Sequence, residues 1–422
     1  MSRRFVVPLV VGSIVITLSM GIRQVFGLLL LPVTVDLTMS REAFGLVVGL
    51  QNLLWGVTQP FAGLLADRFG AARVVAVGGL LYAAGLLLGS FSVGATSFAM
   101  TIGLSVGLAQ SGTAYAVVLG AIARATAPDQ RSLALGIAST AGSIGMFTLV
   151  PLTEALVSES NWRSALVALA ALAALVPLLA FGLREPSAAA SLDERALPSR
   201  NILQIATAQA GFWMLNAGFA ACGFQLALLA THLPSVLTSS GLSASTGAAA
   251  LALIGFSNIV GTYVCGLLGA RFRKNKVLAW LYLARTALFA LFLALPVSPA
   301  SAMLFAAAIG LIWTGTVPLT SGLVGDIFGA RHMGLLFGIV YLGHQFGAFA
   351  GAWAGGLSFD RTGSYGAAWI AAILMGLIAA LLHWPIRDEP GRGCASGHVT
   401  RQGECAAAYF AASLENSFTT RS

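Results

Sequence analysis

Four side chains that could do chemistry lie inside long apolar stretches of this 422-residue sequence: Arg23, Arg285 and the adjacent pair His344 and Gln345. A guanidinium group binds a carboxylate through two parallel hydrogen bonds. A histidine can donate a hydrogen bond to an anion or carry a proton, because imidazole titrates near neutral pH. Ionisable groups inside a membrane are costly and usually functional. These residues therefore favour recognition of a small anion.

No group of residues resembles the machinery of an enzyme. The sequence has no Gly-x-x-x-x-Gly-Lys-Ser/Thr phosphate loop, and its four cysteines have neither metal-ligand nor disulfide-framework spacing. No nucleophile, base and acid can be assembled from the pattern. We therefore expect no catalysis, no cofactor and no bound metal.

Composition places these residues in a membrane protein. Hydrophobic residues make up 57% of the chain and charged residues only 9%, whereas soluble globular chains carry about 25% charged residues. This excludes an ordinary soluble enzyme, a disordered chain and a disulfide-rich secreted domain. The apolar run after Arg4 continues to Pro32. Because a signal peptide would stop earlier, we expect a retained first membrane helix.

Twelve apolar stretches are long enough to cross a membrane as helices of about 20 residues. The longest polar interruption, Arg184–Asn201, falls between the sixth and the seventh stretch. We therefore predict an all-α membrane protein with an N-terminal six-helix bundle over 1–183, a cytoplasmic linker over 184–205, a C-terminal six-helix bundle over 206–386 and a disordered cytoplasmic tail over 387–422. The predicted spans are 5–31, 43–66, 72–92, 96–122, 132–156, 163–183, 206–231, 244–269, 277–295, 299–323, 334–357 and 365–384.

Basic residues are distributed unequally between the loops of this arrangement. Of the 23 Lys and Arg, 18 fall on the side of the N-terminus, three fall on the other side and two lie within spans. Because cytoplasmic loops are enriched in Lys and Arg, we expect both termini in the cytoplasm and the protein in the inner or plasma membrane. Topology thus explains the net charge of +8, and nucleic acid is not expected as a partner.

The two halves of the sequence resemble each other at an offset of 203 positions. The segment Gly63–Phe69 recurs as Gly266–Phe272, and Gly107-Leu108 recurs as Gly310-Leu311. Parallel repeats of this kind, with a substrate site near the midplane between them, are typical of transporters.

The segment Gly63–Arg73 resembles the signature loop between helices 2 and 3 of the major facilitator superfamily. A narrower similarity, to bacterial relatives of the monocarboxylate transporters, is carried by Gly21–Gly27, Gln51–Gly56, His344–Gly347 and Asp360–Tyr365. The resemblance implies a monomeric secondary transporter that works by alternating access and is driven by an ion or substrate gradient.

In that superfamily the signature loop is thought to latch the cytoplasmic side, so the resemblance assigns a gating role to Asp67, Arg68 and Arg73. The alternative is loop charge that only sets topology. In the second half Ala270 replaces the aspartate. We therefore expect that the second copy has lost the latch and has kept only positive charge.

Arg23 is expected in the outer half of the first helix, at a place resembling that of the basic residue which monocarboxylate transporters carry there. The alternatives are snorkelling to the outer headgroups or pairing with Asp36. Arg285 falls in a helix that usually supports the bundle, so bonding of carbonyls or polar groups is an equal alternative to function. For His344 the alternative is a neutral imidazole bonded between helices.

Proton coupling through a buried carboxylate is not expected. Eukaryotic monocarboxylate transporters place an Asp and an Arg in helix 8, where this sequence has the neutral Asn258 and Thr262. His344, the carboxylate of the substrate or simple exchange would have to replace that pair. A coupling proton therefore stays open as a partner.

Together these observations predict a transporter of a small organic anion, most simply a monocarboxylate, in a lipid bilayer. Multidrug or hydrophobic-compound efflux by the same fold stays open, as does a non-transporting membrane sensor. The expected substrate-binding residues are Arg23, Asn52, Gln110, Tyr115, Asn258, His344 and Gln345, with Arg285 as a further buried charge.

Overall fold

The computed structural model describes residues 3–126, 130–183, 199–328 and 333–386. Helices make up almost all of this part of the chain. The N-terminal half contains α1 (Arg3–Gln24), α2 (Phe26–Asp36), α3 (Arg41–Phe69), α4 (Ala71–Ser90), α5 (Ala95–Phe98), the π-helix η1 (Ala99–Val106), α6 (Gly107–Thr113), α7 (Tyr115–Ala125), α8 (Arg131–Glu159), α9 (Trp162–Ala173), α10 (Leu175–Ala180) and the 3-10 helix η2 (Phe181–Leu183).

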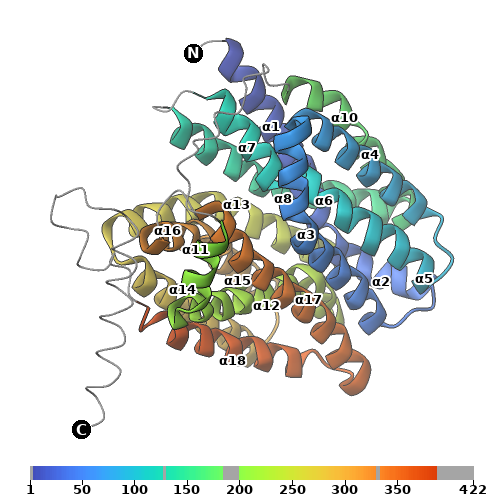
Figure 1. Cartoon of the computed structure of the whole chain (residues 1–422). Helices are drawn as coiled ribbons and strands as arrows, with labels where there is room; N and C mark the ends of the chain where they lie inside the picture. Colours follow the sequence, from blue (N-terminus) through green and yellow to red (C-terminus); the bar gives the residue numbers. More distant parts are fainter. Residues whose placement is uncertain (1–2, 127–129, 184–198, 329–332, 387–422) are drawn as a thin grey trace, which may run out of the picture.

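The C-terminal half is also helical. It contains α11 (Ser199–Thr207), α12 (Ala210–Ser239), α13 (Ala244–Arg271), α14 (Lys274–Ala294), α15 (Pro299–Leu311), α16 (Thr316–Phe328), α17 (Met333–Thr362) and α18 (Gly366–His383). In Figure 1 the helices of the N-terminal half occupy the upper right and those of the C-terminal half the lower left. The predicted linker and tail fall largely outside the described residues.

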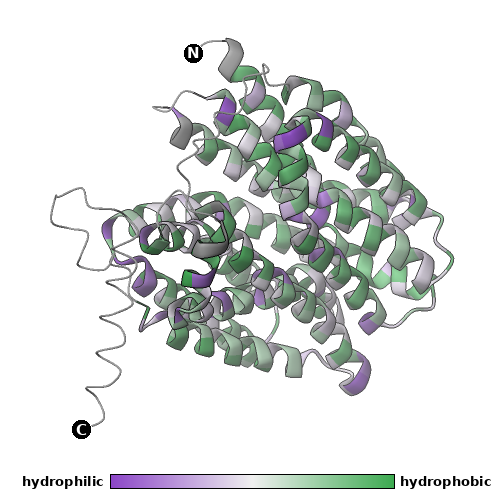
Figure 2. Ribbon diagram, viewed as in Figure 1, coloured by the Kyte–Doolittle hydropathy of each residue, from purple (hydrophilic) through white to green (hydrophobic). Residues whose placement is uncertain are grey.

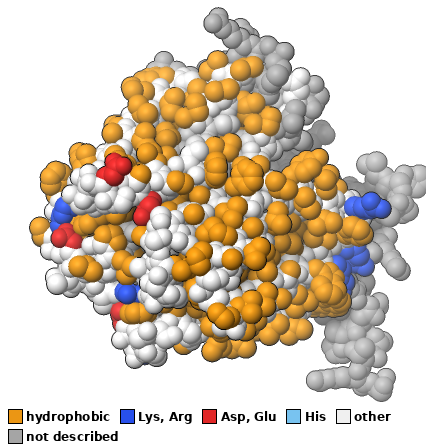
Figure 3. All heavy atoms as spheres, turned by 180° about the vertical axis from the view of Figure 1, so that it is seen from behind, with side chains coloured by type: hydrophobic (Ala, Val, Ile, Leu, Met, Phe, Trp, Pro, Cys, Tyr) orange, Lys and Arg blue, Asp and Glu red, His pale blue; other side chains and the backbone are white. Residues whose placement is uncertain are grey.

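Eleven helical segments within the described ranges are long and apolar enough to cross a membrane. The second predicted span corresponds to α3, which has 29 residues but does not join this set. The polar side chains of Gln51, Asn52 and Gln59 in its middle account for this, since the rest of that stretch is apolar. Hydrophobic residues dominate the ribbon in Figure 2 and the face of the molecule in Figure 3.

Four predicted spans are interrupted in the structure, among them the sixth, 163–183, which is divided at Ala174 into α9 and α10. The first is divided at Val25 into α1 and α2. The fourth, 96–122, is divided at Ala114, whose backbone is extended. The tenth, 299–323, is divided between α15 and α16. The last two breaks occur near repeat-equivalent positions, and both leave backbone groups in the interior that other side chains can bond.

The two halves of the chain meet along helices that approach each other closely. α3 packs against α17, and α8 packs against α13. A methyl group added at Gly45 would collide with the carbonyl oxygen of Ala352, and one at Gly56 would collide with Gln345. Glycines in α3 therefore bring the two backbones together, as small residues do between membrane helices.

The opposite end of this interface is open. The repeat-equivalent glycines Gly63 of α3 and Gly266 of α13 have no atoms within 4 Å of the position of an added Cβ, and the same holds for Gly136 of α8 and Gly338 of α17. Leu64 in the last turns of α3 is 67% exposed. The halves are thus in contact away from the signature loop and separated beside it.

Candidate functional site

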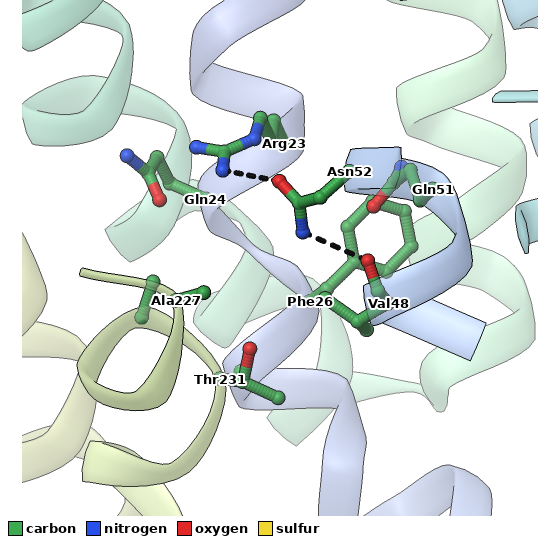
Figure 4. A pocket seen from close by; sticks show the side chains of 10 residues that line it. Arg23, Gln24, Phe26, Val48, Gln51, Asn52, Ala227 and Thr231 are labelled. Carbon is green, nitrogen blue, oxygen red and sulfur yellow. Dashed lines mark hydrogen bonds between the residues drawn. The ribbon is translucent and has the colours of Figure 1, made fainter. Parts of the chain in front are cut away.

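The break between α1 and α2 positions Arg23. It lies in the last turn of α1, where free carbonyl groups favour a positive charge. Side chains from α1, α2, α3 and α12 line a small cavity beside it (Figure 4). This cavity, of about 10 Å³, has room for about one water molecule. A larger ligand must therefore approach the guanidinium from another side.

Asn52 of α3 orients the guanidinium group. Nη2 of Arg23 donates a hydrogen bond of 2.5 Å to Oδ1 of Asn52, as Figure 4 shows. The Nδ2 of Asn52 donates to the carbonyl of Val48 at 2.8 Å, which turns the amide oxygen toward the arginine. The guanidinium carbon lies 5.1 Å from the ring centroid of Trp55, within range of a cation–π interaction.

Arg23 has no counter-ion within the described part of the chain. Asp36, the alternative partner considered above, pairs with Arg163 at 2.8 Å and accepts from the indole of Trp162 at 3.1 Å. The Nε of Arg23 is buried without a hydrogen-bond partner. A buried cation with an unused donor is costly unless water or a ligand completes its bonds. This makes Arg23 the strongest candidate to receive an anion.

A row of aromatic rings, contributed by both halves, extends from Arg23 to His344. Trp55 packs edge-on against Tyr341 of α17, with centroids 5.6 Å apart. The ring of Tyr341 lies parallel to that of His344 at 5.4 Å, and Phe219 of α12 contacts the same imidazole at 4.7 Å. Tyr341 is only half-buried. The side of Arg23 near Tyr341 is therefore the more accessible one.

Buried donors without partners accompany this row of rings. They are Nε1 of Trp55, Nε2 of Gln51 and Nε2 of Gln345. Gln51 and Trp55 share a face of α3. Gln345 of α17 packs against Gly56, which also belongs to α3. Buried N–H groups are nearly always paired in folded proteins. Together with Arg23 they form a set of donors that could surround a carboxylate or water.

His344 and Gln345 bond each other. Nδ1 of His344 lies 3.2 Å from Oε1 of Gln345. Because an amide oxygen only accepts, Nδ1 of His344 is the donor in this contact. Both residues belong to the helix that faces α3, so the structure brings them to the same interface as Asn52.

Three other predicted binding residues have bonds elsewhere. Asn258 links the halves, because its Nδ2 donates to Ser143 of α8 at 2.8 Å and its Oδ1 accepts from the backbone N–H of Thr314 at 3.1 Å. Gln110 is fully buried and donates to Tyr82 at 3.4 Å. The contacts of Asn258 leave it little capacity for a ligand, whereas Oε1 of Gln110 is buried without a hydrogen-bond partner.

Tyr115 lies at the start of α7, directly after the break at Ala114. Its hydroxyl group donates to the carbonyl of Ser139 at 3.5 Å and lies against Gly142. Any side chain at 142 would collide with this hydroxyl. Because the ring is half-buried, Tyr115 can border the same accessible side as Tyr341.

Arg285 supports the C-terminal half. Its Nη2 donates to the carbonyl groups of Ile312 at 2.5 Å and Trp313 at 3.0 Å, at the break between α15 and α16. Its Nη1 donates to Cys222 at 3.2 Å and to Gln225 at 3.4 Å. The side chain is fully buried. The structure therefore supports the structural alternative, in which the arginine bonds carbonyls and polar groups.

The signature loop forms an ion pair with a residue not assigned from the sequence. Oδ1 of Asp67 lies 3.3 Å from Nη1 of Arg124 in α7. Arg73 donates to the carbonyl of Phe69 at 3.2 Å, and Arg68 lies over the ring of Phe69. The described contacts of this cluster stay within the N-terminal half, which is consistent with the separation of the halves at this end.

The second copy of the signature loop carries only basic residues, and one of them pairs with an acid from another helix of the C-terminal half. Nζ of Lys274 lies 2.6 Å from Oδ2 of Asp326. Asp326 is 202 positions after Arg124, so the repeat places the carboxylate on the helix that carries the arginine in the first half. The C-terminal half thus has an ion pair at the corresponding end, in which the loop supplies the basic residue and α16 supplies the acidic one. Comparing Asp67 with Ala270 alone does not reveal this pair.

A cluster at the opposite end joins the halves and was not predicted. The carboxylate of Asp360, at the end of α17, accepts from the backbone N–H groups of Arg41 at 3.3 Å and Glu42 at 2.6 Å. The guanidinium of Arg41 donates to Ser235 at 2.9 Å and to Tyr365 at 2.8 Å. Asp360 thus caps the N-terminus of α3 from the other half of the chain.

We expect Asp360→Ala to loosen this end. Losing an N-terminal cap costs about 0.5–2 kcal/mol, which corresponds to a roughly 3- to 30-fold population shift. Hydrogen–deuterium exchange of the full chain should become faster in residues 41–44 and slower beside the signature loop. Arg361→Ala, an exposed neighbour, is the matched control. Unchanged exchange of the first turn of α3 would contradict this role for Asp360.

Comparison with known proteins decides the family. The family model described as Major Facilitator Superfamily matches residues 11–323. The chain belongs to the major facilitator superfamily. It is therefore a multi-pass membrane protein of a transporter family, in agreement with its apolar helices.

Relatives and solved structures agree with this assignment. YcxA of Bacillus subtilis (strain 168), an uncharacterised transporter of this superfamily, is 26% identical over 349 residues, which cover 81% of this chain and 85% of YcxA. Monocarboxylate transporter 13 of Rattus norvegicus is 29% identical over 323 residues, covering 74% and 72%. A bacterial homologue of the human lysosomal transporter Spinster, in an inward-facing and occupied conformation, matches with a TM-score of 0.69 at 17% identity over 98% of both chains.

The sequence did not single out Trp55, Arg41 and Asp360 as functional candidates, and Tyr341 counted only as one of several polar residues expected to line the cavity. Trp55 and Asp360 stood inside segments that were used only for the family resemblance. Tyr341 precedes His344 by three positions and so shares its helix face. That spacing was the signal that could have added Tyr341 to the predicted site.

Proposed function

We propose that this chain is a secondary active transporter that moves a small organic anion, most simply a monocarboxylate, by alternating access. The observation that carries the proposal is Arg23. The partly buried side chain lies among membrane helices with no described counter-ion, it is held by the neutral Asn52, and its Nε is buried without a partner. A substrate carboxylate would supply the missing charge and acceptors.

In this proposal the substrate lies between Arg23 and the rings of Trp55 and Tyr341. His344 and Gln345 approach from the C-terminal half. Unpartnered donors of Trp55 and Gln345 would bond the anion, and the aromatic rings would contact its apolar part. The similarity to Monocarboxylate transporter 13 supports this substrate class.

Alternating access would operate between two six-helix bundles, over residues 1–183 and 206–386. The sequence repeat and the open space beside Gly63 and Gly266 support this division and a state open toward the signature loop. Closing that end would require Asp67, Arg68 and Arg73 to approach the other half. The basic bias of the loops supports cytoplasmic termini and an inner or plasma membrane location.

The direct test is uptake by proteoliposomes that contain the full chain, with a panel of labelled small monocarboxylates and lipophilic cations. The proposal expects saturable uptake of at least one carboxylate and competition by its analogues. Uptake of lipophilic cations with no binding of any carboxylate would instead identify the efflux alternative.

We expect His344→Gln to remove any pH dependence of uptake. Imidazole gains a proton between about pH 8 and pH 5, and glutamine of similar shape cannot. Uptake should be measured across that range in the wild type, in His344→Gln and in His232→Gln, a control in which a buried histidine bonds a backbone carbonyl. A pH profile that His344→Gln leaves unchanged would exclude His344 as the proton carrier.

A further inference from the structure

A large groove lies between the two halves on the side of α8 and α13. It has a volume of about 940 Å³. Its walls are mostly apolar, and the phenylalanines Phe147 and Phe256, one from each half, meet in it with ring centroids 5.6 Å apart. Both rings are about half exposed. Because α8 and α13 are membrane-spanning segments, hydrocarbon chains of the bilayer can enter such a groove.

Small residues shape the wall that α13 provides. Ala244, Ala248 and Ala252 follow one another at intervals of four residues and line the groove with Ala249. Residues at this spacing lie on one helix face. Their methyl groups give a smooth and shallow surface on which a flexible acyl chain can lie.

One ionisable side chain faces this groove. Glu154 of α8 is partly buried and is the single charged residue among those that line it. It forms no hydrogen bond or ion pair with any residue that the structure describes. It lies seven residues after Phe147, which is about 10 Å along the helix. A carboxylate in such surroundings needs a cationic partner or a proton.

Hydroxyl groups accompany Glu154 at the same end of the groove. Ser158 follows it by one turn, and Ser243 and Ser245 lie at the start of α13. The N-terminus of a helix favours a negative group. Ser158 donates to the carbonyl of Ala155 at 3.0 Å, and the hydroxyl groups of Ser243 and Ser245 bond each other at 2.8 Å, so Ser245 can donate outward when Ser243 is the donor between them. This end of the groove therefore offers an acceptor for a cation and a donor for a phosphate, next to apolar walls that continue toward the middle of the helices.

We propose that this groove binds a phospholipid with a primary amine in its head group, such as phosphatidylethanolamine. The ammonium group pairs with Glu154, the phosphate accepts a hydrogen bond from Ser245, and an acyl chain lies along the alanines to Phe147 and Phe256. A bulky quaternary amine cannot donate a hydrogen bond to Glu154, and an anionic head group is repelled by it. The inference is independent of the substrate that the protein moves.

The test uses the full chain in nanodiscs that contain a phospholipid with a photoreactive acyl chain. Three probes with the same chain carry ethanolamine, choline or glycerol head groups. After irradiation, labelled peptides of α8 and α13 are quantified by mass spectrometry. We expect the ethanolamine probe to label them about fivefold more than the other two, as expected for one charge interaction near the membrane surface.

Variants separate a specific site from general lipid contact. Glu154→Gln should reduce labelling by the ethanolamine probe to the level of the choline probe. Glu159→Gln, an exposed acid at the end of the same helix, should leave it unchanged. Ala249→Phe should fill the groove and lower labelling by all three probes. Equal labelling by ethanolamine and choline probes in the wild type, or unchanged labelling of Glu154→Gln, would overturn the proposal.

Discussion

Arg23→Ala should reduce transport by about 10- to 100-fold while the protein still folds. A charge-assisted bidentate bond to a carboxylate contributes about 1.5–3 kcal/mol, and every 1.4 kcal/mol is a factor of ten. The variant removes this bond and also the electrostatic attraction for any anion. Initial rates of uptake by proteoliposomes, normalised to the amount of folded protein, measure the effect.

Two variants make the Arg23 result specific. Arg23→Lys keeps the charge and loses the planar fork, so we expect an intermediate rate and weaker binding. Arg163→Gln removes an arginine that pairs with Asp36 away from the site, and it should transport within about threefold of the wild type. Wild-type uptake by Arg23→Ala would show that the anion binds elsewhere.

Arg285→Met should be the most destabilising substitution of a charged residue in the chain. It leaves the carbonyl groups of Ile312 and Trp313 and the amide oxygen of Gln225 without their donor. Leaving a buried acceptor without its donor costs about 1–3 kcal/mol for each group. The thermal unfolding midpoint of the detergent-solubilised protein should fall clearly, whereas Arg361→Met, which changes an exposed arginine, should leave it unchanged.

If Arg285 has a structural role, a conservative substitution should change the stability of the protein more than its affinity for substrate. Arg285→Lys retains a donor that can reach some of the same carbonyls, so it should be less stable and yet bind substrate within about threefold of the wild type. Loss of binding with an unchanged unfolding midpoint would mean that Arg285 contacts the substrate after all.

The sequence predicts the membrane helices well because each must satisfy its own backbone and face lipid. A long apolar run therefore predicts a membrane helix without further information. α3 is the informative exception, since Gln51, Asn52 and Gln59 make it less apolar than its neighbours. Two of these polar residues, Gln51 and Asn52, belong to the candidate site, so the predicted span that is least apolar contributes as many site residues as α17 does.

The helix breaks could not be predicted in the same way. Val25 and Ala114 are ordinary helix formers in apolar runs, and neither carries a local signal that ends a helix. Their conformations depend on neighbouring helices, such as the carbonyl of Ala230 that leaves room only for glycine at Gly27. The position of Arg23 in the last turn of α1 is a consequence of one such break.

The pairing of charged side chains was the second feature that could not be predicted from the sequence. The sequence offered Asp36 as a partner for Arg23, but Asp36 bonds Arg163 and Trp162. It also offered Arg68 and Arg73 beside Asp67, which pairs instead with Arg124. Spacing along the chain identifies which charges exist, whereas pairing depends on which helix ends the fold brings together.

Recognition of a carboxylate charge by Arg23 can be tested with two ligands that differ mainly in that charge. Isothermal titration should compare the best carboxylate from the uptake panel with its neutral methyl ester, on the wild type and on Arg23→Ala. We expect the wild type to bind the acid about 10- to 100-fold more tightly than the ester, and Arg23→Ala to lose this preference. A wild type that binds acid and ester equally, or an Arg23→Ala variant that keeps the preference, would contradict this expectation.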